Sequence, residues 1–422
     1  MFVRASCRQY NPRMQHTVVI AGAGQAAGQT VVSLRQGGFA GRIVLIGDEP
    51  YLPYQRPPLS KKFLAGELDA DRLLLRQAKF YTEHNVDVEL GTRVTRIEPG
   101  ARKLDLSSGS SLTYDKLVLA LGSRVREVDL PGSRLAGVHY LRTIDDVNRI
   151  REEFRPGASL VIVGAGYIGL EVAAVAVSHG LKVTVVELAD QVLARVEAPP
   201  VAEFMARIHR EAGVEIRCKT GIQAFKGAMR LRGVVGSDGV EIPADLAIVG
   251  IGILPNVELA RAAGLVCGDG IMVDEYCRTS DADVLAVGDC TNHPNALLGR
   301  RVRLESVHNA QEQAKTAAAT ILGRLEPYAQ IPWFWSDQYD LKLQIVGFSA
   351  RTEQAVIRGE PESRSFAVFF LNAGRLTAVY AINSPREFML SKKLIAVGAR
   401  PDPAVLRNTA VPFKTIAEAL EN

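Results

Sequence analysis

Two short glycine-rich segments stand out because their glycines recur at the same spacing. Residues 22–27 read GAGQAA and residues 164–169 read GAGYIG, and each segment lies between an apolar, β-branched run and an alanine-rich stretch typical of a helix. Glycines in this pattern allow a tight strand-to-helix turn. They also let a pyrophosphate approach the N–H groups at the start of a helix, where the helix dipole favours negative charge. The sequence therefore predicts two dinucleotide-binding sites in one chain.

An acidic residue follows each glycine segment at the distance expected of a ribose-binding carboxylate. Asp48 and Glu49 follow one strand-like run, and Glu187 follows another. Glu187 predicts NADH rather than NADPH, because a carboxylate accepts a hydrogen bond from a free 2′-hydroxyl but repels a 2′-phosphate. The next residues, 188–190 (LAD), contain no cation that could bind such a phosphate. Two ordinary βαβ units with acidic loop ends are the alternative interpretation.

Length and composition indicate a large α/β protein. The chain has 422 residues, 47% of them hydrophobic, which is enough for two or three domains with sizeable cores. Its 50 basic and 46 acidic residues nearly balance without a long basic run, so charge gives little support to nucleic-acid binding. No apolar run reaches the ~20 residues of a membrane-spanning helix. We therefore expect neither nucleic-acid binding nor membrane insertion.

The N-terminal residues have no pattern of regular structure. Residues 1–13 carry three arginines but lack the apolar segment of a secretory signal. We expect a disordered tail, with Met14 as a candidate natural start and an organellar targeting segment as the alternative.

The cysteines and histidines are scattered along the chain. The seven histidines show neither HxH nor HExxH spacing, which argues against a metal site. The five cysteines form no CxxC pair, a pattern typical of reduced thiols in the cytoplasm rather than of a disulfide framework. They are Cys7, Cys218, Cys267, Cys277 and Cys290.

The elements that must hold these residues can be outlined from the pattern of apolar runs and breakers. Two buried-strand patterns, 116–123 and 245–252, stop at glycines, and a third strand pattern ends in Gly-Asp within 279–290. The proline-dense segment 50–61 cannot form a regular helix or a central strand. From about residue 327 the chain alternates in short strand-like runs, which predicts a separate domain.

Six segments resemble those of the FAD-dependent, NADH-using ferredoxin reductases, in particular the putidaredoxin reductase type that serves bacterial cytochromes P450. The resemblance covers nearly all of the chain after Met14, and the order of the segments makes it specific. They are PYQRPPLSK (53–61), LVLALGS (117–123), GAGYIGLE (164–171), DVLAVGDC (283–290), LESVHNAQEQA (304–314) and PWFWSDQYD (332–340).

The resemblance implies a glutathione-reductase-like α/β architecture with two Rossmann-type dinucleotide-binding domains and an α+β C-terminal domain. The expected FAD-binding domain is discontinuous and comprises residues 14–123 and 248–327. The NADH-binding domain would comprise residues 124–247, and the C-terminal domain residues 328–422.

The resemblance also implies roles for individual residues. Lys61 would lie near the flavin N5 edge, where a cation stabilises the reduced flavin. Tyr167 would act as a gate between nicotinamide and flavin, and Glu171 as a positioning group. A packed aromatic ring and an ordinary carboxylate at a helix start are the alternatives for these two. The other expected cofactor-binding residues are Gly22, Gly24, Ala27, Asp48, Glu49, Arg56, Gly122, Asp289, Val307, Trp335, Gly164, Gly166, Ile168, Gly169, Glu187 and Gly252.

The implied reaction is hydride transfer from NADH to FAD, followed by single-electron transfer to a [2Fe-2S] ferredoxin. Disulfide reductases of the same architecture need a CxxxxC pair to relay electrons, and residues 50–79 contain no cysteine. An NADH oxidase, a quinone reductase, and a redox-sensing flavoprotein similar to apoptosis-inducing factor are the alternatives.

The partner implied by the resemblance is acidic, so a basic docking face is expected. The residues that match basic partner-facing positions of the family are Arg76, Lys315, Lys392, Lys393 and Lys414. We expect a cytoplasmic monomer or weak dimer.

Overall fold

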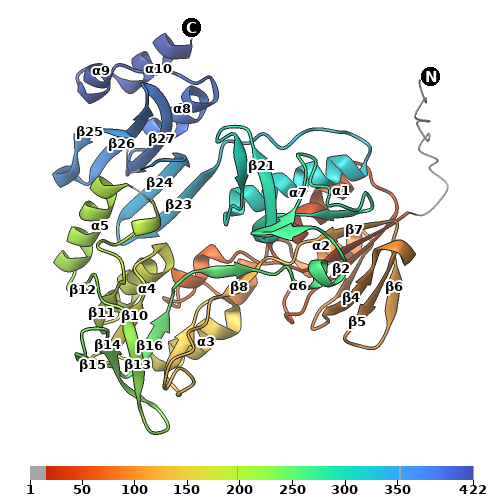
Figure 1. The fold of residues 1–422 in the computed structure, drawn as a ribbon, viewed down its shortest axis with the longest axis horizontal. Helices are drawn as coiled ribbons and strands as arrows, with labels where there is room; N and C mark the ends of the chain where they lie inside the picture. The colour runs from red at the N-terminus through yellow and green to blue at the C-terminus, as the bar shows by residue number, and fades with distance from the viewer. Residues whose placement is uncertain (1–15, 197, 351–352, 422) are drawn as a thin grey trace. The chain divides into compact units, whose positions relative to one another are not determined.

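The chain divides into two units, each of which contains one glycine-rich segment. The computed structural model describes residues 16–196, 198–350 and 353–421 (Figure 1). The first unit comprises the described residues up to Tyr54, then Leu74–Gly122 and Pro255–Ala329; the second comprises Gln55–Leu73, Ser123–Leu254 and the described residues from Gln330. The expected tail, 1–13, and Met14 lie outside the described residues. The proline-dense segment forms no regular helix or strand beyond the short 3-10 helix Pro57–Ser60, and most of it belongs to the second unit.

A five-stranded parallel sheet forms the centre of the first unit. Two of its strands, Thr17–Ala21 and Arg42–Ile46, are rich in β-branched residues and mostly buried, as in a sheet that is covered on both faces. In spatial order they are β20 (Val284–Ala286), β7 (Lys116–Leu119), β1 (Thr17–Ala21), β2 (Arg42–Ile46) and β3 (Val86–Glu89).

Alternate residues of this sheet enter two separate cores. Val18 and Ile20 of β1 pack on the side of α1 (Gln25–Gln36) and α7 (Val307–Ile321). Val19 and Ala21 pack on the other side, in the core that also receives the small antiparallel sheet β4 (Val94–Glu98), β5 (Lys103–Leu106) and β6 (Ser111–Thr113). This arrangement places the carboxyl ends of β1 and β2 at one edge of the sheet, where the first glycine-rich segment begins.

The second unit repeats this plan. Its parallel sheet has the order β12 (Glu215–Arg217), β11 (Lys182–Val186), β10 (Ser159–Val163), β16 (Leu246–Val249) and β9 (Val138–Tyr140). A small antiparallel sheet again covers one face: β13 (Ile222–Gly227), β14 (Leu231–Gly236) and β15 (Glu241–Pro243). β8 (Ser123–Val125) pairs with β17 (Ile253–Pro255).

The C-terminal part of the second unit is a five-stranded sheet of antiparallel pairs with helices against it (Figure 1). In order the strands are β23 (Trp333–Gln338), β24 (Leu341–Gly347), β27 (Arg375–Ile382), β26 (Ser365–Asn372) and β25 (Gln354–Glu360). The helices there are α8 (Pro385–Ala396), α9 (Pro403–Arg407) and α10 (Phe413–Glu421).

The two units contain further helices and strands. Other helices are α2 (Ala78–Glu83) and α6 (Glu258–Ala262) in the first unit and α3 (Ile144–Glu153), α4 (Tyr167–Ser178) and α5 (Pro199–Glu211) in the second. The first unit also contains the strands β18 (Cys267–Gly268), β19 (Gly270–Met272), β21 (Thr291–Asn295) and β22 (Arg300–Val302).

Candidate functional site

The first glycine segment forms a tight turn from β1 into α1. Gly22 has φ +111°, and a Cβ on it would lie 2.2 Å from the carbonyl oxygen of Ala120, so no other residue fits there without movement of the backbone. Gly24 caps α1, and a Cβ on it would have no heavy atom within 4 Å. The start of α1 is therefore open in front of its N–H groups, as a bound pyrophosphate requires. Ala27, in the first turn of α1, is fully buried.

Three carboxylates lie around this turn. The chain after β2 packs on it, since a Cβ on Gly47 would lie 2.4 Å from the Cβ of Ala23. Glu49 accepts a hydrogen bond of 2.6 Å from the Tyr54 hydroxyl, whereas the exposed Asp48 pairs with Arg93 at 3.2 Å. Glu49 is thus the better fixed of the two expected ribose ligands.

The third carboxylate, Asp289, comes from a distant part of the sequence. It lies in the 3-10 helix Gly288–Cys290 after β20, and a Cβ on Gly288 would lie 3.2 Å from the side chain of Ala26 in α1. Asp289 therefore stands beside the helix start. Gly122, with φ +60°, and Val307, the first residue of α7, belong to the same unit. A glycine turn open at a helix start, with carboxylates on both sides, fits the adenosine and pyrophosphate of FAD.

The second glycine segment repeats the geometry of the first. Gly164 has φ +103°, and a Cβ on it would lie 2.5 Å from the carbonyl oxygen of Gly250. Gly166 caps α4 and faces open space, while a Cβ on Gly169 would lie 2.2 Å from the Gly164 carbonyl oxygen. The three glycines thus serve the turn, the approach of a phosphate and the close packing of helix on strand. Ile168, 44% exposed, lies in the first turn of α4.

Glu187 is fixed beside this second turn by the backbone. Its Oε2 accepts a hydrogen bond of 2.7 Å from the Ala165 N–H, and its Oε1 accepts one of 2.9 Å from the Ala189 N–H. Each carboxylate oxygen keeps acceptor capacity for a ribose hydroxyl. The arrangement fits the adenosine ribose of a nicotinamide dinucleotide.

Two cations near this site have no signal in the sequence. The Lys219 N–H donates to the Ala189 carbonyl at 2.8 Å, so the backbone of an exposed lysine lies beside the segment that follows Glu187, although residues 188–190 contain no cation. The Arg195 guanidinium lies against Gly252, 2.8 Å from where a Cβ would be, and donates to the Ile251 carbonyl at 3.3 Å. Both residues were missed because only the fold brings Lys219 to Ala189 and Arg195 to Gly252.

Glu171 and Lys61 form a buried ion pair in the second unit. The Lys61 Nζ lies 2.7 Å from Glu171 Oε2, and the Glu171 side chain is only 3% exposed. The hydroxyl of Ser60 donates to the same oxygen, and that of Ser336 donates to Oε1 at 2.5 Å. Burial raises the pKa of Glu171, and the Lys61 charge is the largest influence that opposes this rise.

The other expected residues of the second unit lie around α4 and β23. Tyr167 begins α4, and its ring lies 4.6 Å from that of Phe334; desolvation of its hydroxyl is the main reason why its pKa lies well above the usual value. Trp335, on β23, packs on Trp333 with ring centroids 5.6 Å apart. Arg56 donates to the Arg142 carbonyl at 2.6 Å. The structure thus brings Tyr167, Glu171 and Lys61 together, whereas their roles toward a flavin stay predictions.

Comparison with known proteins agrees with this geometry. Residues 16–314 match the family described as pyridine nucleotide-disulphide oxidoreductase, and residues 333–417 match the family described as reductase C-terminal. The chain belongs to the pyridine nucleotide-disulphide oxidoreductases. It is a flavoprotein oxidoreductase of the ferredoxin reductase type, with FAD and NAD(H) as cofactors, and the predicted glutathione-reductase-like fold is confirmed.

Three similar proteins illustrate the match. The ferredoxin–NAD(+) reductase component of an anthranilate 1,2-dioxygenase system from Burkholderia cepacia is 43% identical over 398 residues, which is 94% of this chain and 98% of the relative. The crystal structure of a covalent putidaredoxin reductase–putidaredoxin complex gives a TM-score of 0.93 at 41% identity, covering 96% of this chain and 99% of that one. The ferredoxin reductase for the CYP199A2 system of Rhodopseudomonas palustris also gives 0.93, at 42% identity and 95% and 99% coverage.

No two cysteines of this oxidoreductase lie close enough in the sequence to form a CxxxxC pair. The described cysteines Cys218, Cys267, Cys277 and Cys290 are free thiols. Burial raises the pKa of Cys290 to about 12 and that of Cys277 further, so neither is a thiolate near neutral pH. Among the described residues, no group of His, Cys, Asp and Glu side chains could hold a metal ion. No helix in the described ranges is long and apolar enough to span a membrane.

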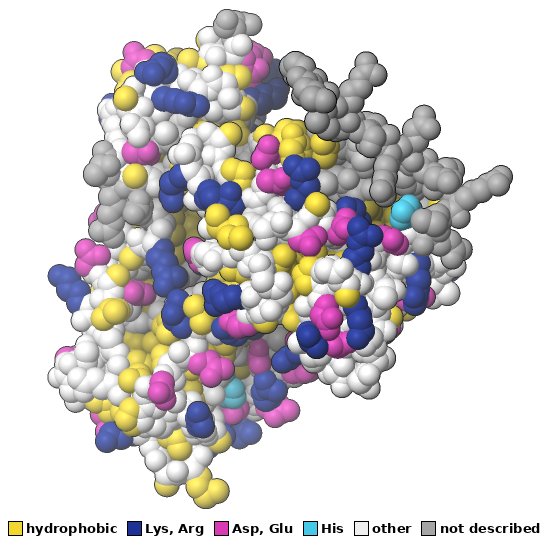
Figure 2. Space-filling view, turned by 45° about the vertical axis from the view of Figure 1, so that its right-hand side comes forward, with side chains coloured by type: hydrophobic (Ala, Val, Ile, Leu, Met, Phe, Trp, Pro, Cys, Tyr) yellow, Lys and Arg dark blue, Asp and Glu magenta, His cyan; other side chains and the backbone are white. Residues whose placement is uncertain are grey.

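The five basic residues expected to face a partner are divided between the two units. Arg76 and Lys315 belong to the first unit, and Lys392, Lys393 and Lys414 belong to the second. Lys315 pairs with Glu312 and Lys414 with Glu418. On the face shown in Figure 2, basic and acidic side chains are interspersed rather than gathered in a single block.

Lys392 differs from the other four because it is half-buried. Its ammonium lies 4.3 Å from the ring centroid of Trp333 and 4.4 Å from that of Phe388, and burial lowers its pKa. Cation–π contacts therefore hold it in place.

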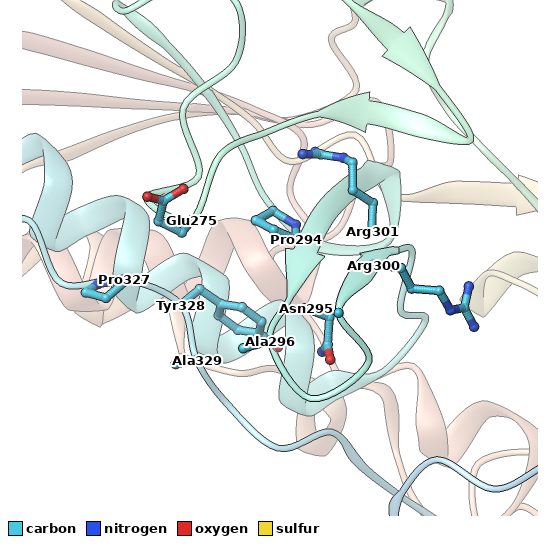
Figure 3. A pocket seen from close by; sticks show the side chains of 10 residues that line it. Glu275, Pro294, Asn295, Ala296, Arg300, Arg301, Pro327, Tyr328 and Ala329 are labelled. Atoms are coloured by element: carbon cyan, nitrogen blue, oxygen red, sulfur yellow. The ribbon is translucent and has the colours of Figure 1, made fainter.

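A pocket of about 420 Å³ lies in the first unit. Figure 3 shows Tyr328 at its centre, between the loop that joins β21 to β22 and the chain at Pro327, with Arg300 directed away from the ring. None of the residues that line it was expected to bind a cofactor, and we assign no role to it.

Proposed function

We propose that this oxidoreductase transfers electrons from NADH to a [2Fe-2S] ferredoxin. The observation that carries the proposal is the second glycine turn with the Glu187 carboxylate fixed beside it, which suits a free 2′-hydroxyl. The chemistry that bound FAD supplies is acceptance of a hydride and release of electrons one at a time.

The residues of the chain bind and orient rather than exchange protons in this scheme. The open starts of α1 and α4 bind the two pyrophosphates, Glu49 and Glu187 bind riboses, and Arg195 adds a positive charge beside the second turn. The buried Lys61–Glu171 pair supplies a cation in a fixed position. The Glu171 carboxylate already compensates its charge before any electron arrives.

Similarity to known proteins, the missing cysteine pair and the basic residues support a ferredoxin as the acceptor. A solved relative at 41% identity is in covalent complex with putidaredoxin, and several curated relatives are named as ferredoxin reductases. The absence of a cysteine pair between residues 50 and 79 also removes the relay that a disulfide substrate would need. The five basic residues would attract an acidic ferredoxin.

The relatives serve two kinds of terminal oxygenase system. One relative belongs to the CYP199A2 system and another to a dioxygenase system, so similarity supports both kinds. We propose a cytochrome P450 on the resemblance of the ESVHNA and PWFW segments. The scattered cysteines favour a cytoplasmic location, and we infer a monomer or weak dimer.

Anaerobic stopped-flow absorbance tests the proposal directly. The FAD-loaded protein is mixed first with NADH or NADPH and then with an oxidised [2Fe-2S] ferredoxin. Fast bleaching by NADH, much slower bleaching by NADPH, and reduction of the ferredoxin are expected. Bleaching without transfer to any ferredoxin would favour an NADH oxidase or quinone reductase, and a slow, long-lived charge-transfer complex would favour a redox sensor.

A further inference from the structure

A continuous chain of hydrogen bonds leads from Glu171 through the second unit to the protein surface. Ser336 donates to Glu171 at 2.5 Å, and the Gln338 amide nitrogen donates to the Ser336 hydroxyl at 3.0 Å. The Gln338 amide oxygen lies 2.8 Å from His209 Nε2, and His209 Nδ1 lies 2.9 Å from the Tyr339 hydroxyl. The side chains come from α4, α5 and β23 with the residue after it, elements that lie together in the second unit (Figure 1).

The negative charge on Glu171 determines which group donates and which accepts in every link of this hydrogen-bond chain. An ionised carboxylate can only accept, so the Ser336 hydroxyl proton points to Glu171 and the Ser336 oxygen must accept from Gln338. The Gln338 oxygen then faces His209, which donates from Nε2 and accepts at Nδ1 from Tyr339. All donors point toward Glu171, and hydrogen bonds aligned in this way strengthen one another.

The burial of these side chains shows that the chain is not a surface network. Ser336, Gln338 and His209 are 1%, 2% and 0% exposed, whereas Tyr339 is 38% exposed. Burying this many polar groups is unfavourable unless every one of them is hydrogen-bonded. Apolar side chains would fill the same space without this desolvation cost. The hydrogen-bond chain ends, moreover, on the carboxylate that forms the ion pair with Lys61.

We propose that His209 and Gln338 are positioning residues for the reaction: they orient the Ser336 hydroxyl toward Glu171 and so keep the Lys61–Glu171 pair charged. The proposal rests on the proposed function for its consequence in catalysis. Its structural part concerns only side chains of this protein. The ionisable groups at this site include Lys61, whose charge opposes the rise in the pKa of Glu171, and Tyr167 on the same helix, whose pKa is raised by burial and then by Tyr380 and Glu171.

The test measures the protonation of Glu171 itself. Infrared difference spectra of the FAD-loaded protein are recorded against pH without NADH, and the carboxylic acid band is assigned by its loss in Glu171→Gln. His209→Phe and Gln338→Leu are expected to raise the apparent pKa of Glu171 by about one unit, the effect of one hydrogen bond to a charged group. His209→Gln, which can still donate to Gln338, is expected to restore most of the wild-type value.

The matched control is His293→Gln, which replaces another buried histidine. Neither ring nitrogen of His293 has a hydrogen-bond partner among the described residues, and it lies in the first unit. This variant is expected to leave the titration of Glu171 unchanged. An equal shift in the control, or folded His209→Phe and Gln338→Leu proteins with the wild-type pKa of Glu171, would overturn the proposal.

A kinetic experiment separates this proposal from the proposed function. His209→Phe is expected to move the acidic limb of the pH profile for NADH-dependent bleaching upward, and in a Glu171→Gln background it is expected to have no such effect. If wild-type protein is not bleached by NADH, the proposed function fails, and the infrared titration still decides the role of His209.

Discussion

The Lys61 ammonium lies 2.7 Å from the Glu171 carboxylate, with 16% and 3% of the two side chains exposed. A buried pair of this kind is strongly destabilised when one partner is removed, because the other charge is left without compensation. We expect Glu171→Gln to lower the free energy of unfolding by roughly 3 kcal/mol. Urea denaturation measures the change.

The exposed pair Lys315–Glu312 provides the control for this substitution. Glu312→Gln removes a carboxylate from an ion pair of 2.6 Å whose lysine is about half exposed. Exposed pairs contribute little, so a change within about 0.5 kcal/mol is expected. If both variants lost the same free energy of unfolding, the Lys61–Glu171 pair would contribute no more to stability than an exposed ion pair.

The sequence predicted the parts of the site whose residues lie close together in the chain, and it did not predict contacts between distant residues. The two glycine turns and Glu187 lie in contiguous βαβ units with a fixed pattern, so they could be placed. The contact of Glu171 with Ser336 spans 165 residues, and no local pattern encodes it. Resemblance supplied Lys61 and Glu171 as candidates, but it could not supply the ion pair between them.

Lys219 shows the same limit at the adenosine end of the second site. Residues 188–190 contain no cation. Only the hydrogen bond from the Lys219 N–H to the Ala189 carbonyl brings a basic residue beside this segment. A non-glycine residue with φ +55° carries no sequence signal either.

Glu187 is expected to set the preference for NADH over NADPH. Glu187→Gln removes the charge that repels a 2′-phosphate and one of the oxygens fixed by Ala165 and Ala189. We expect about tenfold weaker NADH binding, the effect of one hydrogen bond to a charged group, and a smaller difference between the two nucleotides. Titration of flavin bleaching with each nucleotide measures both effects, and an unchanged preference would contradict the assignment.

Lys219→Ala in the Glu187→Gln background extends this experiment. If the exposed lysine attracts the 2′-phosphate, NADPH binding should weaken severalfold while NADH binding stays the same. Repeating the titration at high salt should remove the difference, because the lysine is exposed.

Arg195 is expected to contribute to dinucleotide binding through its position against Gly252. The backbone next to Arg195 is held in position at Val196. The Val196 carbonyl accepts hydrogen bonds from the Tyr380 hydroxyl at 2.9 Å and from the Ser349 hydroxyl at 3.2 Å. Arg195→Ala should raise the Kd for NADH about tenfold, since an interaction with a phosphate is charge-assisted. Arg232→Ala, at an exposed position on β14, is the control and should leave the Kd unchanged.

The stability of the first unit should depend on pH through His293. Burial, and secondarily the charge of Arg301, lowers the pKa of this histidine from 6.5 to about 4. Between these values the unfolded chain binds a proton that the folded chain does not, so stability falls as pH falls from 6.5 to 4. The full effect of this one group is about 3 kcal/mol.

Urea unfolding at a series of pH values tests this dependence. His293→Gln should flatten the curve between pH 6.5 and about 4 without changing the part above pH 7. His84→Gln replaces an exposed histidine and should keep the wild-type slope. A slope that persists in His293→Gln would assign the dependence to other groups.

Docking of an acidic ferredoxin is expected to depend on Lys315 and Lys392. Neutralising both to Gln should slow ferredoxin reduction at low salt, because steering between opposite charges raises the association rate. Turnover of NADH with ferricyanide should be unchanged, since a small acceptor does not need the docking face.

Lys392 also packs on Trp333 and Phe388, so Lys392→Met, which keeps apolar contact without the charge, separates lost packing from lost charge. If Lys392→Met retains wild-type ferredoxin reduction at low salt, the charge of Lys392 is not used for docking.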